Sequence, residues 1–286
     1  MTSARIDELV AAGPTYSFEF FPPKTPEGHR HLARALVELQ PLEPSFVSVT
    51  YRGGPASRYP THDLVTGMLR TTELNPMAHL ICAGHSRLEL ADILVQLRKA
   101  GIVNLMALGG DPPEGEDPGE LRHAAELVEL ARAIGGFSIG VAAHPAVHPR
   151  SPSRAADRDF LAAKLSMADF AVTQSVFSVA HWQELVAELA ERGVTKPVIP
   201  GIMPLTRPRS AARQSELGAV VPPEVAARVD AAGDDPEAVE RTGIELATEL
   251  CRQLLDAGAP GLHFYTLNRS QATRRIHAEL GLSVRS

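Results

Sequence analysis

A glutamate stands inside an aromatic segment near the start of the chain. Glu19 lies in the run SFEFFPPK, between Phe18 and Phe20 and just before two prolines. Burial among Phe18, Phe20 and Phe21 would penalise the carboxylate and raise its pKa. A carboxylic acid that stays protonated near pH 7 is suited to general acid catalysis. We therefore predict that Glu19 is a general acid, with a buried ion pair to a lysine or arginine as the alternative.

Three more polar residues follow apolar segments. Asp111 ends ALGGD, where two glycines let a ligand approach the backbone, although a turn capped by Asp111 would explain them as well. Gln174 in VTQ offers a donor and an acceptor together, as an amide-like heterocycle requires, or else it holds loop backbone. Arg269 in LHFYTLNRS can clamp a carboxylate bidentately, unless it is only an exposed residue at a helix start.

Two histidines stand four residues apart in AHPAVHP. On a helix, the spacing of His144 and His148 would suit a metal ion. The prolines between and after them disfavour a helix, and no clear third ligand follows. We predict no metal site here and interpret both histidines as lining a ligand groove or packing the loop.

The segments that carry these residues alternate between short β-branched runs and longer stretches of helical period. This pattern is typical of repeated βα units and a parallel sheet. Eight strands are predicted, at residues 16–20, 46–51, 79–82, 103–108, 139–143, 170–175, 198–202 and 262–266. Eight strands fit an α/β fold, a closed (β/α)8 TIM barrel, as a single domain over residues 1–286. Because active sites of such barrels gather at the carboxyl ends of the strands, the polar residues would converge on one mouth.

Helices are expected between the strands, for example at residues 28–39, 88–100 and 121–134. The segment 204–237 interrupts the alternation of strands and helices and is interpreted as an extra loop and helix. In the segment 88–100 a stripe of apolar residues is expected to face inward, and Gly101 to end the helix: Leu88, Ala91, Leu94, Val95 and Leu97.

Composition narrows the classes of function. A net charge of −6 gives no basic field for a nucleic acid. Cys82 and Cys251 lie in apolar stretches, which indicates core residues in a reducing compartment. There is no apolar run long enough for a membrane span and no signal-peptide pattern, so we expect a cytoplasmic protein without a membrane partner. No G-x-G-x-x-G follows a strand, so a nicotinamide cofactor would bind in the barrel mouth. A homo-oligomer is left open.

Eight fragments, in order from near residue 16 to near residue 280, together resemble methylenetetrahydrofolate reductases: SFEFFPPK, FVSVTY, HLIC, ALGGD, AAHPAVHP, VTQ, IPGIMP and HFYTLNR. The resemblance implies a (β/α)8 barrel that reduces 5,10-methylenetetrahydrofolate to 5-methyltetrahydrofolate with NADH or NADPH. It implies that Glu19 is the general acid, that Asp111 faces the pterin and stabilises its charge, that Gln174 bonds to the pterin, and that Arg269 lies near the glutamate tail.

The same resemblance implies a cofactor site, because the family normally relays the hydride through FAD. Residues at flavin-contacting positions are Thr50, His79, His148, Asp157 and Lys164. Three residues at the flavin-contacting part of the site differ from those of the family: Gly109 replaces an arginine, His144 replaces a tyrosine and Phe160 replaces a small polar residue. Ser210 and Gln214 align with the family's glutamine and aromatic that hold substrate or nicotinamide.

Three interpretations remain. A weakened site could still bind FAD and act by a ping-pong mechanism. Alternatively, FAD is absent and NADH or NADPH passes its hydride directly to the folate, which the departures favour. A folate-binding barrel without reductase activity is the third, and the retention of Glu19 and Asp111 argues against it, because binding alone needs no buried acid.

Overall fold

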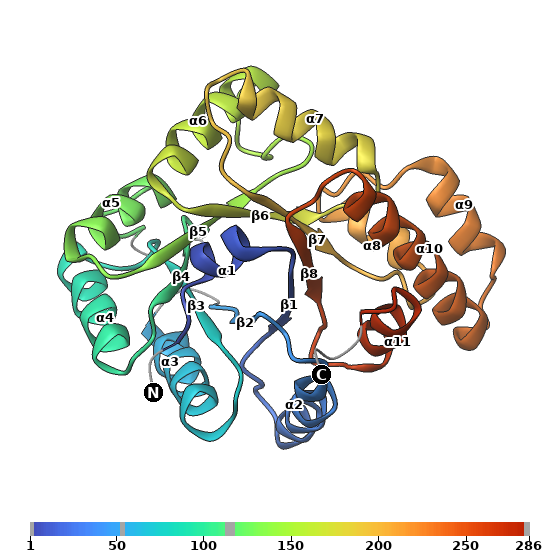
Figure 1. The fold of residues 1–286 in the computed structure, drawn as a ribbon, viewed down its shortest axis with the longest axis horizontal. Coiled ribbons are helices and arrows are strands. Elements are labelled where there is room, and N and C mark those ends of the chain that lie inside the picture. Colours follow the sequence, from blue (N-terminus) through green and yellow to red (C-terminus); the bar gives the residue numbers. More distant parts are fainter. Residues whose placement is uncertain (1–2, 52–54, 112–117, 283–286) are drawn as a thin grey trace.

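Eight parallel strands close into a barrel in the computed structural model, which describes residues 3–51, 55–111 and 118–282 (Figure 1). Neighbouring strands pair in sequence order, and β8 closes on β1 through pairs such as Tyr16 with Leu262. The predicted (β/α)8 barrel is confirmed. The strands are β1 (Thr15–Phe20), β2 (Phe46–Val49), β3 (Pro76–Ile81), β4 (Asn104–Leu108), β5 (Ser138–Ala143), β6 (Phe170–Ser175), β7 (Val198–Ile202) and β8 (Gly261–Tyr265).

All helices except α1 (Ile6–Ala12) lie outside the ring of strands (Figure 1). The bounds are α1 (Ile6–Ala12), α2 (Pro26–Leu39), α3 (Pro55–Thr71), α4 (Arg87–Lys99), α5 (Ala124–Ile134), α6 (Arg154–Met167), α7 (Val179–Ala190), α8 (Ser210–Glu216), α9 (Pro223–Ala231), α10 (Pro236–Asp256) and α11 (Gln271–Glu279), with a short 3-10 turn at Gln40–Leu42. The irregular segment after β7 holds α9, as expected, and also α8, which the sequence pattern did not predict. Within the described residues, no helix combines the length and apolar character needed to cross a lipid bilayer.

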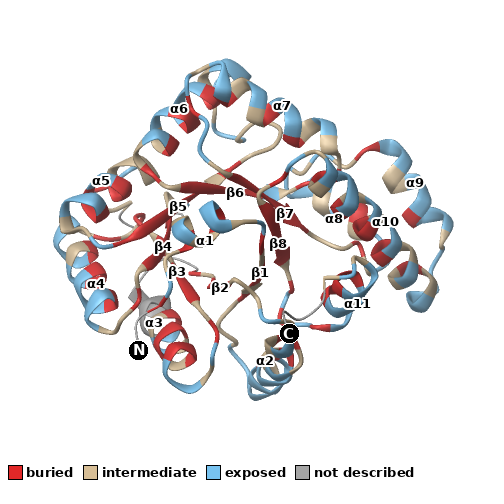
Figure 2. Cartoon of the chain, in the orientation of Figure 1, coloured by how far each residue is buried: buried red, intermediate tan, exposed pale blue. Residues whose placement is uncertain are grey.

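The inward stripe of α4 differs from the prediction. Leu88 is 80% exposed and Val95 also faces solvent, whereas the buried residues are Leu90, Ile93, Leu94 and Leu97 (Figure 2). These four follow the spacing i, i+3, i+4, i+7, which defines one face of a helix. The helix begins at Arg87 because Ser86 and Glu89 form a capping box there. Gly101 follows the helix with φ +90°, in agreement with its predicted role.

The amino-terminal end of the barrel is closed by α1. Ile6 and Val10 pack inside with apolar side chains from the strands: Phe46, Met77, Met106, Phe170, Val172 and Ile199. The first N–H groups of α1 donate to barrel side chains, from Ile6 to Asn104 Oδ1 at 3.0 Å and from Asp7 to Ser138 Oγ at 3.0 Å. The carboxyl ends of the strands form the opposite end, where polar residues collect. Both cysteines are buried, as predicted.

Candidate functional site

A cavity of about 370 Å³ lies at the carboxyl ends of the strands. Glu19, Gln174 and Tyr265 reach it from β1, β6 and β8, and His144 reaches it from the loop after β5. The segment around α8 covers one side with Gln214, Leu217 and the residues up to Val220. Three predicted site residues, Glu19, Gln174 and His144, are therefore brought to one cavity.

Glu19 lies on the inner face of the barrel between two histidines. Its Oε2 is 3.6 Å from Nε2 of His79 and 3.6 Å from Nε2 of His263. The hydroxyl of Ser48 donates to the same oxygen at 3.4 Å. Successive residues of a strand face opposite sides, so the neighbouring Phe18 and Phe20 point outward into the core beneath the helices.

The predicted rise in the pKa of Glu19 is wrong. Burial does raise the pKa, but interactions with His263, His79 and Ser48 outweigh it, so the pKa lies below the ordinary value of glutamate. The reason is the pleat of β1, which turns the phenylalanines away from the carboxylate and turns the histidines toward it. The alternative of a lysine or arginine partner is also wrong, since the neighbours of the carboxylate are histidines.

His263 was not predicted as a site residue. Its Nδ1 lies 2.8 Å from Ser17 Oγ, and its ring stacks on Phe46 with centroids 5.9 Å apart. Two residues further along β8, the hydroxyl of Tyr265 donates to the carbonyl of Thr173 at 2.5 Å. Burial, with the charge of Glu19, raises the pKa of Tyr265 well above its ordinary value. The alternation of HFYT, read as a strand, would have placed both rings inside the barrel.

Asp111 lies outside the cavity lining. Its side chain is 87% exposed and pairs with Arg150, whose Nη1 is 3.0 Å from Oδ1. Arg150 also donates to the carbonyl of Gly110 at 3.3 Å. Gly110 has φ +76°, and a Cβ on it would lie 2.0 Å from Cγ2 of Ile81, so the turn requires glycine. The role predicted for Asp111 stays a prediction.

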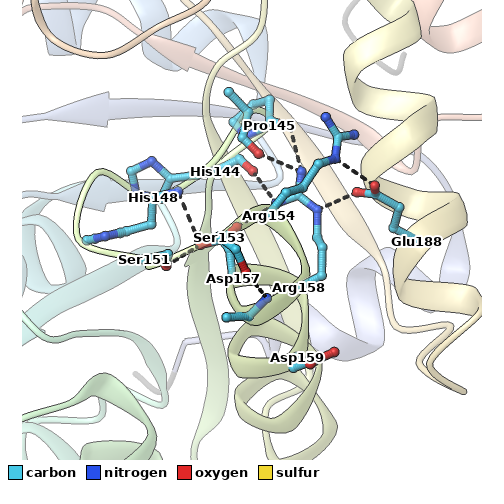
Figure 3. A network of polar contacts seen from close by, with 12 residues as sticks. His144, Pro145, His148, Ser151, Ser153, Arg154, Asp157, Arg158, Asp159 and Glu188 are labelled. Carbon is cyan, nitrogen blue, oxygen red and sulfur yellow. Dashed lines mark hydrogen bonds and ion pairs between the residues drawn. The ribbon is translucent and has the colours of Figure 1, made fainter.

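The loop after β5 carries His144 and His148, whose rings meet edge to face with centroids 4.5 Å apart. Burial, assisted by the charge of His148, lowers the pKa of His144 to about 4, so its imidazole is neutral at pH 7. Asp157 holds the far part of this loop, because its Oδ1 accepts from the His148 N–H at 3.1 Å and from Ser151 Oγ at 2.9 Å (Figure 3). Among the described residues, no three His, Cys, Asp or Glu side chains gather as a metal ion would require.

The remaining predicted site residues Lys164, Thr50 and Arg269 do not line the cavity. Lys164 donates from Nζ to the carbonyl of Ala142 at 2.8 Å, and burial lowers its pKa to about 8. The N–H of Thr50 donates to the carbonyl of Phe20 at 2.9 Å. Arg269 is exposed at the surface after β8 and does not line the cavity.

The departures from the family pattern have distinct surroundings. A Cβ on Gly109 would meet only the backbone nitrogen of Ala124, at an ordinary 3.6 Å, so packing does not require glycine there. Phe160 is 64% exposed, and helical spacing puts it on the side of α6 that carries Asp157 and Lys164. Gln214 lines the cavity, whereas Ser210 begins α8.

Comparison with known proteins gives consistent matches. A sequence model of the protein family described as "Methylenetetrahydrofolate reductase" matches residues 5–281. The chain is 34% identical over 269 residues to the 5,10-methylenetetrahydrofolate reductase of Pectobacterium carotovorum, covering 93% of this chain and 90% of that one. It is 32% identical to the methylenetetrahydrofolate reductase (NADH) 1 of Zea mays, with 97% of this chain and 50% of that one covered.

A solved structure has the same fold. It is described as an uncharacterized protein from Clostridium thermocellum that binds two copies of 5-methyl-5,6,7,8-tetrahydrofolic acid. The TM-score is 0.65, the sequence identity is 12%, and 96% of each chain is covered. At this identity, the likeness shows the barrel fold alone.

Proposed function

Since this chain belongs to the methylenetetrahydrofolate reductase family, we propose that it reduces 5,10-methylenetetrahydrofolate to 5-methyltetrahydrofolate, and that the hydride passes directly from NADH or NADPH without a flavin. The observation that carries the proposed reaction is the carboxylate of Glu19, held between His79 and His263 at the base of the cavity. A proton donor at that place is what the substrate's chemistry requires.

The five-membered ring of the methylene folate opens when a nitrogen is protonated, which leaves an exocyclic iminium cation that accepts a hydride. Glu19 would supply that proton. In the free chain its lowered pKa leaves it ionised near pH 7. Folate that fills the cavity would displace water from the Glu19 side chain, which is 19% exposed, and this further desolvation would raise the pKa, so that Glu19 can hold a proton next to the ring nitrogen.

The remaining predicted residues have roles that agree with their places. Gln174 would bond to the amide edge of the pterin from the cavity wall. Asp111 would leave its ion pair with Arg150 and turn toward the pterin. This ion pair is exposed to water and therefore contributes little free energy. Arg269, exposed after β8, would attract the glutamate tail of the folate.

The residues at the family's flavin positions do not fit FAD, which supports direct transfer. Both oxygens of Asp157 are occupied by groups of the protein, and Lys164 is bonded to a backbone carbonyl. Gly109 supplies no cation for a diphosphate, and exposed Phe160 presents an aromatic ring on the same side of α6. A nicotinamide cofactor enters and leaves in each turnover, so it needs a weaker hold than a resident flavin.

Isotope transfer distinguishes the two routes. NADH and NADPH carrying deuterium at C4, labelled separately on each face, are supplied to protein purified without added flavin. Direct transfer moves the deuterium from one of the two faces into the methyl group of the product. A flavin relay would lose the label, because the hydrogen carried on the flavin exchanges with water. Loss of label, with flavin absorbance near one equivalent per chain, would overturn the proposed route.

A folate-binding barrel without reductase activity is the second candidate, because the cavity lined by Glu19 and Gln174 would also suit binding of folate without its reduction. The substitution Glu19→Gln separates the two. As a reductase, the variant should lose at least about 100-fold in kcat, the contribution of a general acid, while its Kd for folate changes little. Wild-type protein that binds folate but oxidises neither NADH nor NADPH would support the second candidate.

A further inference from the structure

A fully buried arginine joins α6 to the cavity wall. Arg158 has no exposed surface and is the largest of the fully buried side chains in the described part of the chain. An arginine is rarely buried completely, because removal of its charge from water is costly unless the charge is paired and every donor is bonded. Figure 3 shows that Arg158 lies between the loop after β5 and Glu188 of α7.

Each of the five N–H groups of Arg158 has an acceptor. Two carboxylates balance its charge: Glu188 accepts from Nε at 2.5 Å, and Asp157 accepts from Nη1 at 2.6 Å. The other three donors bond to consecutive backbone carbonyls, those of His144 at 3.2 Å, Pro145 at 2.9 Å and Ala146 at 2.6 Å. Three carbonyls in a row are thus fixed by a single planar group.

The loop needs such an external donor. Pro145 and Pro149 lack N–H groups, so the loop is limited in the hydrogen bonds that it can make within itself. Arg158 fixes its beginning, and the adjacent Asp157 fixes its later part through His148 and Ser151. Two neighbouring residues of α6 therefore hold the whole loop.

The three residues that Arg158 holds are the ones from this loop that line the cavity: His144, Pro145 and Ala146. We propose that Arg158 is a positioning residue for the nicotinamide, because it fixes the wall against which the ring of NADH or NADPH lies. The inference rests on the proposed function. A neutral His144 is suited to this place, since the nicotinamide gains positive charge as it gives up its hydride and a charged imidazole would oppose that change.

The test compares Arg158→Lys with Arg154→Gln. Lysine keeps the buried charge and its carboxylate partners, so the variant should fold, but three donors on one nitrogen cannot replace the five of a guanidinium. Arg154 provides a matched control one turn earlier. It pairs with Glu184 and with the same Glu188, its side chain is 45% exposed, and it donates to these carboxylates of α7 instead of to the loop carbonyls.

The expected result is a split between kinetic constants. Arg158→Lys should raise the KM for NADH or NADPH about tenfold or more, while the KM for folate stays within twofold and thermal unfolding remains cooperative. Arg154→Gln should keep both KM values within twofold. A wild-type nicotinamide KM in folded Arg158→Lys, or an equal rise in Arg154→Gln, would overturn the proposal.

A second readout does not depend on turnover. In an NMR titration of the protein alone, the pKa of His144 should rise from about 4 toward its ordinary value in Arg158→Lys, because the loosened loop exposes the ring. An unchanged pKa would count against loop positioning. Failure of direct deuterium transfer, together with the expected rise in the pKa of His144, would overturn the proposed hydride route and still support the positioning of the loop by Arg158. Direct deuterium transfer with an unchanged nicotinamide KM in Arg158→Lys would support the hydride route and overturn the positioning role.

Discussion

Replacement of Gly109 by arginine should increase the affinity of the chain for FAD. The backbone at this position tolerates a side chain, because its φ lies outside the left-handed region and the nearest atom to a Cβ is 3.6 Å away. A hydrogen bond to a charged group contributes about 1.5–3 kcal/mol, and a guanidinium can make two parallel bonds to a phosphate. After the entropic cost of ordering the arginine side chain is subtracted, the net gain in the binding free energy of FAD is about 3 kcal/mol. This corresponds to roughly 100-fold tighter binding.

The assay is the quenching of FAD fluorescence on titration with protein. Gly109→Gln is the control, since it adds a shorter side chain that can donate hydrogen bonds but carries no charge. The double variant with Phe160→Ser should bind at least as tightly as Gly109→Arg, because it removes the exposed ring beside Asp157 and Lys164. Equal Kd values for Gly109→Arg and Gly109→Gln would refute the reasoning. Tight binding of FAD by the wild-type protein would refute it as well.

Two further predictions concern stability. Because the pKa of Glu19 is lowered in the folded chain, its carboxylate stabilises the fold above the ordinary pKa of glutamate, and this contribution is lost as the pH falls toward the lowered pKa. Urea unfolding of Glu19→Gln at a series of pH values should therefore show a shallower loss of the free energy of unfolding in acid; a slope equal to that of wild type would contradict the assignment. In α4, Leu94→Ala should cost about 2–5 kcal/mol and Leu88→Ala less than about 0.5 kcal/mol, because only Leu94 is buried. Similar costs for both would show that the inward face is misplaced.

The barrel could be predicted because each βα unit carries its own local signal. The strand Phe170–Ser175 is bounded as expected, and Gly101 ends α4 through a backbone conformation that glycine adopts readily. Where the prediction failed, the missing information was the direction of side chains. Phe18 and Phe20 are close to Glu19 in sequence but lie on the opposite face of β1.

The partners of the site residues are distant in sequence, which is why composition and spacing did not identify them. His263 meets Glu19 only because β8 closes on β1. Arg158 resembles a solvated residue of a helix, although it precedes Leu161 and Leu165 at the spacing of the buried stripe. A charged residue within such a stripe is a signal that could have been used.

The helix that closes the amino-terminal end of the barrel has a consequence for kinetic order. With α1 packed against Phe46 and Met77, the cavity is approached from the carboxyl end, and both substrates of the proposed reaction would share that approach. The pterin must reach Glu19 at the base, so it would enter before the nicotinamide, and the methylated product would leave last. The substrates should therefore bind in a compulsory order and not at random. Oxidised dinucleotide should then compete with NADH or NADPH only for the folate-bound form of the enzyme.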